Sequence, residues 1–193
     1  MRNTHPFEPL IFKNTRKLLV GTLPPETASF YFSNSSNTRL WDILKSISLD
    51  DKSISQNSNN LSNQEKIKIL KSLDIGIYDI IKDYDRNILD STKDKNIIPL
   101  KYNDIANLVT NSAVNELIFV YKNAAKWFLH SLTGEFPKKV TKIKTELEYG
   151  KFHKLKIGDK EISCVLLPSP LNRGRKGETL DFKLSEYRKR IKN

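Results

Sequence analysis

The stretch from Leu18 to Leu44, LLVGTLPPETASFYFSNSSNTRLWDIL, contains an apolar strand, a loop of aromatic and polar residues, and the start of a helix. The strand pattern ends at Gly21, and Pro24 and Pro25 then stiffen the exit of the chain. Aromatic residues and asparagines follow, in a connection that must be partly exposed. Because loops at the ends of strands commonly carry binding residues, this stretch predicts a binding site.

Four short apolar segments predict the strands of one sheet. They are rich in Ile, Val and Leu and lack strict alternation, which is typical of strands that are covered on both faces. The segments are Lys17–Gly21, Gly76–Ile81, Glu116–Tyr121 and Glu161–Leu167. The sequence KLKIGDKEISCV also predicts a hairpin that turns at Gly158–Asp159 and adds an antiparallel strand.

Helical patterns lie between these strands, with apolar faces at 40–47, 67–73, 105–109, 124–129 and 180–191. Strands that alternate with helices predict a three-layer α/β/α sandwich around a mainly parallel four-stranded sheet. We expect residues 1–193 to form a single domain. Residues 50–63 are mostly Ser, Asn and Asp, so they predict a flexible surface loop.

The charge of the chain points to a polyanionic partner. There are 33 Lys and Arg residues against 22 Asp and Glu, a formal net charge of +11. Nucleic acid is the first candidate partner and an anionic membrane the second, while a solvated lysine-rich surface is the alternative. No apolar run approaches the roughly 20 residues of a membrane span, and the N-terminus has no signal-peptide pattern. We therefore expect a cytoplasmic monomer that does not bind a membrane.

Residues that commonly carry catalysis are scarce. Cys164 lies in the apolar run ISCVLLP, which indicates a buried small hydrophobe, and a lone cysteine excludes disulfides within the chain and four-cysteine metal sites. His5, His130 and His153 have no partner at metal-ligand or triad spacing, so we interpret them as surface or packing residues. Neither a Walker loop nor GxGxxG is present, so we expect no metal and no cofactor.

A second unusual loop, LPSPLNRGRKG, follows the last predicted strand. In a parallel sheet this loop and the loop after Gly21 lie at the same carboxyl edge, where α/β proteins bind ligands. Its prolines, the apolar Leu171 and the nearby Arg173 and Arg175 suit a duplex from which one base has been removed. A plain loop with solvated charges has the same composition, so composition leaves both interpretations open.

Together the two loops resemble the signature motifs of the uracil-DNA glycosylase superfamily. GTLPP is similar to the first motif, which takes forms such as GQDPYH and GINPG, and LPSPLNRG to the second, with forms such as HPSPLS. FYFSNSSNTRLWDIL resembles a segment of the mismatch-specific and hypoxanthine-DNA glycosylases. IGIYDIIKDYDRN and the segment Asp94–Ile97 resemble the middle of hypoxanthine-type members. The resemblance spans nearly the whole chain. It implies a monofunctional DNA glycosylase that flips a deaminated base, uracil or hypoxanthine, out of DNA and hydrolyses its N-glycosidic bond.

The resemblance also implies residues that hold the flipped base. Phe32 falls where the family stacks an aromatic ring on the base, and a neighbouring frame would put Tyr31 or Phe30 there. Ordinary core packing is the alternative for each ring. The expected base-binding set is Gly21, Thr22, Pro24, Tyr31, Phe32 and Asn34.

The second motif is expected to contact the DNA. Leu171 falls at the wedge that fills the hole left by the flipped nucleotide, and Ser169 at a serine–proline turn that grips a phosphate. Arg173 matches a position from which some relatives contact DNA. The expected DNA-binding set is Ser169, Pro170, Leu171, Asn172, Arg173 and Arg175.

Two positions depart from the family pattern. Leu23 replaces the Asp or Asn that orients the attacking water, and Leu167 replaces the histidine that stabilises the leaving base. Both losses resemble the hypoxanthine-DNA glycosylase branch. Asn37, which aligns with a family asparagine, and Asp79, at the end of the second strand, are therefore the candidate catalytic residues. The alternatives are that Asn37 caps the next helix and that Asp79 caps or pairs.

The departures leave two other functions open. A catalytically weak or inactive member of the same fold would recognise modified or single-stranded DNA through the same pocket. An unrelated α/β hydrolase or nucleotide-binding domain is the third hypothesis, and the absence of a nucleophile elbow and of a P-loop counts against it.

Overall fold

The structure, a computed structural model, describes residues 3–33, 38–54, 61–88, 94–133, 147–172 and 178–192. Its centre is a five-stranded sheet in the order β3-β2-β6-β8-β7. The strands are β2 (Lys17–Gly21), β3 (Ile75–Asp79), β6 (Glu116–Phe119), β7 (Phe152–Ile157) and β8 (Lys160–Leu166). All except β7 run parallel, so the carboxyl ends of four strands meet at one edge of the sheet.

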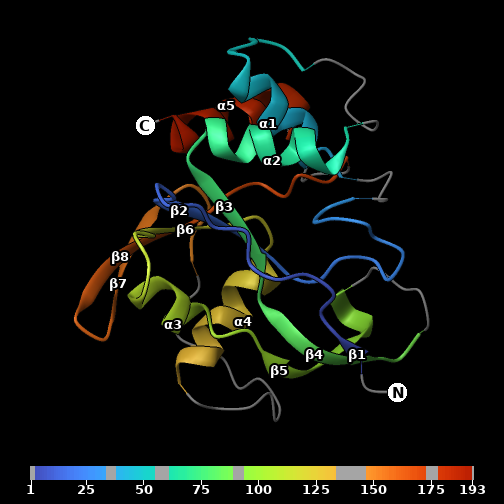
Figure 1. Ribbon diagram of the computed structural model, residues 1–193, viewed down its shortest axis with the longest axis vertical. Helices are drawn as coiled ribbons and strands as arrows, with labels where there is room; N and C mark the ends of the chain where they lie inside the picture. The colour runs from blue at the N-terminus through green and yellow to red at the C-terminus, as the bar shows by residue number, and fades with distance from the viewer. Residues whose placement is uncertain are drawn as a thin grey trace.

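Helices lie on both sides of this sheet (Figure 1). On one side are α1 (Leu40–Ser48), α2 (Asn63–Ser72) and α5 (Leu180–Ile191), and on the other are α3 (Ile105–Thr110) and α4 (Lys122–Leu132). α2 begins with a capping box, in which the Ser62 hydroxyl accepts from the Glu65 N–H and the Glu65 carboxylate accepts from the Ser62 N–H. The result is the α/β arrangement that the alternating sequence pattern predicts.

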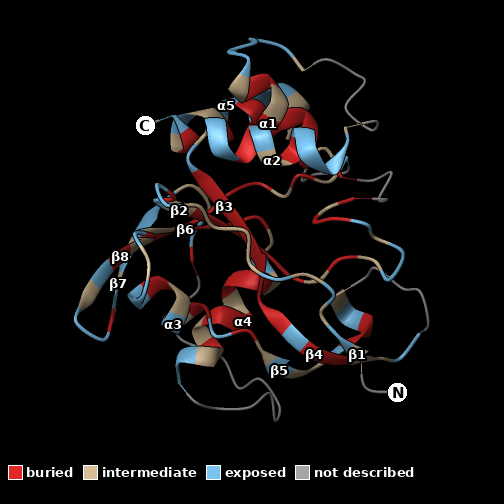
Figure 2. Ribbon diagram, viewed as in Figure 1, coloured by how far each residue is buried: buried red, intermediate tan, exposed pale blue. Residues whose placement is uncertain are grey.

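The core lies between the central strands and the helices that cover them. Every residue of β3 is buried, and so is all of β2 after Lys17, which explains why neither strand alternates in sequence (Figure 2). The outer strand β7 instead alternates between exposed and half-buried positions up to Ile157. Its edge therefore shows the pattern of a strand with one solvated face.

A second, three-stranded antiparallel sheet flanks the first. It consists of β1 (Asn3–Thr4), β4 (Ile81–Arg86) and β5 (Ile97–Tyr102) in the order β1-β4-β5. β4 follows β3 after the single residue Ile80, so one continuous run of chain passes from the central sheet into this smaller one (Figure 1).

The structure corrects three details of the predicted fold. The central sheet has five strands rather than four, because β7 of the predicted hairpin pairs with β8 along its whole length. The predicted strand Gly76–Ile81 covers β3 without its first residue, the connecting Ile80, and the first residue of β4. The smaller sheet was missed because β1 has only two residues and because Pro99 interrupts the pattern of β5, an edge strand where proline is tolerated. Of the predicted loop at 50–63, residues 55–60 lie outside the described residues.

Candidate functional site

The carboxyl ends of β2 and β3 bring three predicted site residues to one point. Gly21 and Asp79 end these strands side by side, as direct partners in the parallel register. A Cβ atom on Gly21 would lie 2.2 Å from Asp79 Oδ1 and 2.6 Å from Phe32 Cζ. Glycine is therefore required here, because any side chain would displace the carboxylate, the ring, or both.

Asp79 is almost entirely buried, and its two oxygens have different surroundings. Oδ1 lies against Gly21, close to the Phe32 ring, whereas Oδ2 is 3.1 Å from Nε2 of His5. The side chains of His5 and Asp79 are only 3% and 4% exposed. The sequence predicted His5 to be a surface or packing residue; its ring is buried, and it also contacts Asp79, which sequence spacing did not predict. The pair joins positions 74 residues apart, and no spacing rule connects them.

Phe32 has an unusual backbone conformation. Its φ of +52° lies in the left-handed region, which a bulky residue occupies only when its surroundings hold it there. The ring is half-buried and stacks on Tyr121, with centroids 6.0 Å apart and planes 27° from parallel. The backbone therefore turns this ring toward Gly21 and the edge of the sheet.

The residues around Phe32 supply the contacts that hold the loop. The Tyr31 hydroxyl donates to the Glu8 carbonyl at 2.9 Å, and the Trp41 indole N–H donates to the Tyr31 carbonyl at 2.9 Å. Lys66 Nζ donates to the Ser33 hydroxyl at 2.8 Å. Tyr31 and Phe30 are themselves buried in the core. Among the three consecutive rings, Phe32 is the one that lies over Gly21.

A second polar network adjoins Asp79. The Thr22 hydroxyl donates to Asp94 Oδ1 at 3.1 Å, and Asn123 Nδ2 donates to Asp94 Oδ2 at 3.0 Å. Burial raises the pKa of Asp94, and the nearby charge of Asp79 raises it further, against the lowering effect of the two hydrogen bonds. The segment that begins at Asp94 resembles hypoxanthine-type members in sequence, but neither Asp94 nor Asn123 was predicted as a site residue. The position of Asn123 just after β6 was the only available signal.

The loop after β8 lies beside the aromatic loop. Thr38 pairs with Leu171 in an isolated antiparallel bridge, and Arg39 N donates to the Pro170 carbonyl at 2.7 Å. From α5, Lys183 Nζ donates to the Leu171 carbonyl at 2.5 Å, and the Tyr187 hydroxyl donates to the Pro168 carbonyl at 3.0 Å. Helix α5 and the start of α1 thus hold this loop from two sides.

The structure describes three more of the predicted site residues, namely Pro24, Ser169 and Asn172. Pro24 is buried, and its carbonyl accepts a bond from Arg86. Ser169 is half-buried with its hydroxyl 3.4 Å from the Leu171 N–H, and Asn172 is exposed. Asn34, Asn37, Arg173 and Arg175 lie outside the described residues.

The two positions that depart from the family motifs are apolar in surroundings as well as in type. Leu23 packs against the core while partly exposed, and Leu167 is fully buried with its N–H bonded to the Phe119 carbonyl at 2.9 Å. Neither side chain can position a water molecule or donate to a base. Polar contacts at this edge must therefore come from other residues, and among the described residues Asp79 contacts Gly21.

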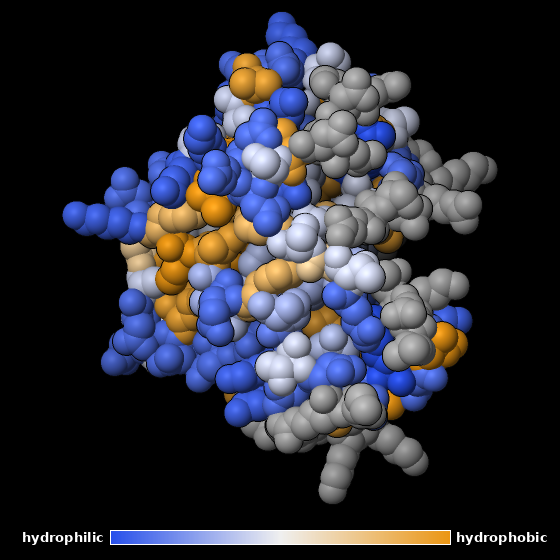
Figure 3. All heavy atoms as spheres, turned by 45° about the vertical axis from the view of Figure 1, so that its right-hand side comes forward, coloured by the Kyte–Doolittle hydropathy of each residue, from blue (hydrophilic) through white to orange (hydrophobic). Residues whose placement is uncertain are grey.

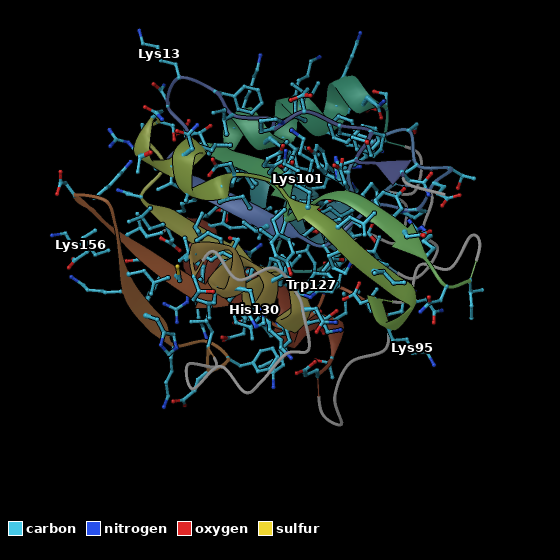
Figure 4. All side chains as sticks on the ribbon, turned by 90° about the horizontal axis from the view of Figure 1, so that it is seen from below. Lys13, Lys95, Lys101, Trp127, His130 and Lys156 are labelled. Atoms are coloured by element: carbon cyan, nitrogen blue, oxygen red, sulfur yellow. The ribbon has the colours of Figure 1, made fainter. Side chains whose placement is uncertain are left out.

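The surface that Figure 3 shows is mostly hydrophilic. Hydrophilic residues cover most of the face in Figure 3, with hydrophobic residues gathered in one region. Lys13, Lys95 and Lys156 project outward on different sides of the molecule (Figure 4). None of the helices in the described ranges is long and apolar enough to cross a membrane.

Among the described residues, metal-ligating side chains form no centre of their own, and the single cysteine is buried. In the part of the chain that the structure describes, no cluster of three or more His, Cys, Asp or Glu side chains could hold a metal ion. Cys164 is fully buried, as its sequence context predicts, and burial raises its pKa to about 12. A thiol in this state is a poor nucleophile.

Comparison with known proteins agrees with this geometry. The solution NMR structure of a candidate uracil DNA glycosylase from Methanosarcina acetivorans superimposes with a TM-score of 0.63. The two chains are 18% identical and cover each other completely, so the likeness shows a shared fold. A search of curated proteins gave no significant match. The family model described as the uracil DNA glycosylase superfamily matches residues 9–191. The chain therefore belongs to the uracil DNA glycosylase superfamily.

Proposed function

We propose that this protein is a monofunctional DNA glycosylase of the hypoxanthine-DNA glycosylase type. It removes a deaminated base, uracil or hypoxanthine, after the nucleotide has been flipped out of DNA. The observation that carries the proposal is the convergence of Asp79 Oδ1 and the Phe32 ring on Gly21 at the carboxyl edge of the sheet. The loop of Leu171 lies beside the same aromatic segment.

Asp79 gives this arrangement a chemical preference among bases. Uracil and hypoxanthine each carry a ring N–H where cytosine and adenine have an unprotonated ring nitrogen. An ionised carboxylate only accepts hydrogen bonds, so it pairs with that N–H and repels the lone pair of the parent base. Stacking on Phe32 supplies affinity for any base, and the carboxylate supplies the choice between deaminated and parent bases.

The bond cleavage needs electrostatic help rather than a strong nucleophile. The C1′–N bond breaks with its electron pair going to the base, which leaves a cationic sugar that water attacks. Leu23 and Leu167 cannot stabilise these charges or position the water. We therefore assign these roles to Asp79 and Asn37. The Asp79 carboxylate stabilises the cationic sugar, and Asn37 positions the water.

The loop after β8 stabilises DNA from which one nucleotide has been flipped out. Leu171 fills the space that the nucleotide leaves in the duplex, and the arginines at 173 and 175 contact phosphates. The contacts of Lys183, Arg39 and Tyr187 with the backbone of this loop support its role as a rigid wedge. A rigid wedge loses little conformational entropy when it enters the duplex.

The test is incubation with oligonucleotides that carry one uracil, hypoxanthine or xanthine, followed by alkali. Strand breaks at the modified base support the proposal. Because Leu23 and Leu167 favour it, the second candidate function is a non-catalytic protein that binds modified or single-stranded DNA. Binding without breaks supports that alternative, and the absence of both binding and breaks contradicts both functions.

A further inference from the structure

His5 is a buried histidine that the mechanism above does not use. Its ring packs among three aromatic rings, with centroid distances of 5.7 Å to Tyr31, 5.8 Å to Phe7 and 6.1 Å to Tyr78. Its Nε2 atom is 3.1 Å from Asp79 Oδ2, whereas Oδ1 is the oxygen that lies against Gly21. The histidine thus lies behind the carboxylate, away from the expected base.

The N-terminal segment holds His5 in this place through backbone pairing. His5 N donates to the Lys82 carbonyl at 2.7 Å, directly after β1 pairs with β4. Further along, Leu10 and Ile77 exchange two backbone hydrogen bonds of 3.1 and 3.0 Å at the edge of β3. The segment therefore runs along the outer edge of the sheet and carries the imidazole to the end of β3.

The second ring nitrogen has a partner in both charge states. Nδ1 lies 3.1 Å from the Phe7 N–H and 2.9 Å from the Phe7 carbonyl oxygen. A neutral ring accepts from the N–H, and an imidazolium donates to the carbonyl. In both states Nε2–H donates to Asp79. Uptake of a proton by His5 therefore exchanges the Phe7 N–H for the Phe7 carbonyl as the partner of Nδ1 and keeps the Nε2–H bond to Asp79.

We propose that His5 is a positioning residue for Asp79 and that its proton sets the net charge next to the leaving base. The inference rests on the function proposed above. With a neutral His5 the buried pair carries one negative charge, which opposes departure of an anionic base. With an imidazolium the pair has no net charge. Repulsion of the departing base then falls more than attraction of the cationic sugar, because Oδ1 pairs with the base and the sugar lies beyond it. In both states Nε2–H donates a hydrogen bond to Oδ2, so Oδ1 is the oxygen that accepts from the base.

No proton passes through the pair in this step. The C1′–N bond breaks with its electrons going to the base, and water adds its oxygen to C1′. The attacking water loses one proton to solvent, and the anionic base takes up one proton from solvent. His5 stays protonated from start to finish and acts through charge alone.

The other groups near the pair that can carry a charge are two tyrosines and three carboxyls. Burial, together with the charges of Glu8 and Asp79, raises the pKa of Tyr78 to about 12. The pKa of Tyr31 is raised further, mainly by burial and by Asp79. Asp83, on β4, accepts from the Thr4 hydroxyl, and Asp94 and Glu8 are the remaining carboxyls nearby. Histidine is the residue type that ordinarily titrates between about pH 5 and 8.

The experiment is a pH profile of the single-turnover cleavage rate, measured on whichever oligonucleotide the protein cleaves. His5→Gln keeps an N–H donor for Asp79 but takes up no proton. His5→Phe keeps the ring packing but removes the donor. His153→Gln is the matched control, since the His153 ring on β7 contacts the Glu148 N–H at 3.2 Å and lies outside the proposed site.

We expect the wild-type rate to fall roughly tenfold or more with rising pH across about pH 5 to 8, the range in which the histidine residue type ordinarily titrates. The rate of His5→Gln should not depend on pH and should equal the rate that the wild type has at high pH. His5→Phe should be slower than the wild type at every pH. His153→Gln should show the same pH profile as the wild type. A His5→Gln protein that keeps the wild-type pH profile overturns the inference while leaving the proposed function intact. If the folded wild-type protein cleaves no substrate, the proposed function fails and this inference fails with it.

Discussion

The Oδ1 atom of Asp79 occupies the place where a side chain on Gly21 would begin, 2.2 Å from the position of its Cβ atom. The two residues are register partners at the ends of adjacent parallel strands. The carboxylate therefore lies at the carboxyl ends of β2 and β3, where Oδ1 lies against Gly21 and Oδ2 contacts His5. The Phe32 ring also lies against Gly21. This relationship is the basis of the predictions that follow.

Gly21→Ala should impair cleavage far more than it impairs folding. The added methyl group has to push away Asp79 or Phe32, at a cost of about 1–3 kcal/mol in the free energy of unfolding. Urea unfolding measures that cost, and single-turnover cleavage measures the effect on the site. Gly158→Ala is the control, because it strains a residue with φ of +59° in the β7–β8 hairpin and should leave cleavage by the folded protein unchanged. Equal cleavage by the two variants would count against the role of Gly21.

Phe32→Ala should weaken the hold on a flipped base by about 1–3 kcal/mol, the usual contribution of one stacked ring. Its cleavage rate should fall more than its affinity for undamaged duplex, and its melting temperature should change little because the ring is half-buried. Phe30→Ala provides the contrast: its ring is in the core, so the free energy of unfolding should fall by about 3–5 kcal/mol. If Phe32→Ala unfolds the protein instead, the ring belongs to the core.

Lys183→Met should loosen the loop that carries Leu171. Lys183 is 1% exposed, burial lowers its pKa, and its ammonium group donates to the Leu171 carbonyl. Loss of this charged hydrogen bond should reduce the free energy of unfolding by about 1–3 kcal/mol. Cleavage of duplex DNA should fall more than cleavage of single strands, which have no stack to fill.

The matched control for this variant is Lys189→Met on the same helix, where the lysine forms an exposed ion pair with Glu186. It should behave as the wild type does on both substrates. An equal loss on duplex and single strand for Lys183→Met would mean that the loop does not act as a wedge.

Replacing Arg173 and Arg175 together by glutamate should weaken binding to all DNA sequences to a similar degree. Phosphate contacts carry no sequence information, and each one lost reduces the slope of log affinity against log salt by about 0.9. Fluorescence anisotropy at several salt concentrations measures both quantities. Lys13→Glu with Lys156→Glu makes the same change of charge at two outward-pointing residues and should have a smaller effect (Figure 4). Salt-independent binding by the wild type would exclude this electrostatic interface.

Local patterns in the sequence predicted most of the central sheet and its helices. β2 was predicted with its observed limits, since an apolar run that ends at glycine and then meets prolines is an unambiguous local signal. The passage from β3 into β4 was not predictable in this way, because the run GIYDII is apolar on both sides of the break at Ile80. What decides the break is pairing with distant partners: Gly21 and Lys17 in one sheet, Tyr102 in the other.

The site residues also separate into those that a local sequence pattern predicts and those that it does not. Gly21, Phe32 and Asp79 each had a local signal at the end of a strand or in the loop that follows it. His5 and Asp94 had none, because their roles come from contacts with residues far away in the chain. Asn37 was predicted as catalytic and lies outside the described residues, so its role stays a prediction.

The most direct test of the central claim is the rate at which the wild-type protein and Asp79→Ala cleave one duplex containing uracil and one containing hypoxanthine. Duplexes with cytosine or adenine at the same position serve as controls. The account predicts that the wild type cleaves at least one deaminated substrate and neither parent. It also predicts that Asp79→Ala, still folded and still bound to DNA, cleaves about a hundredfold more slowly, the effect of removing one preorganised electrostatic group. Full activity in Asp79→Ala would contradict the assignment of the site, and a wild-type protein that binds these duplexes without cleaving them would contradict the proposed function.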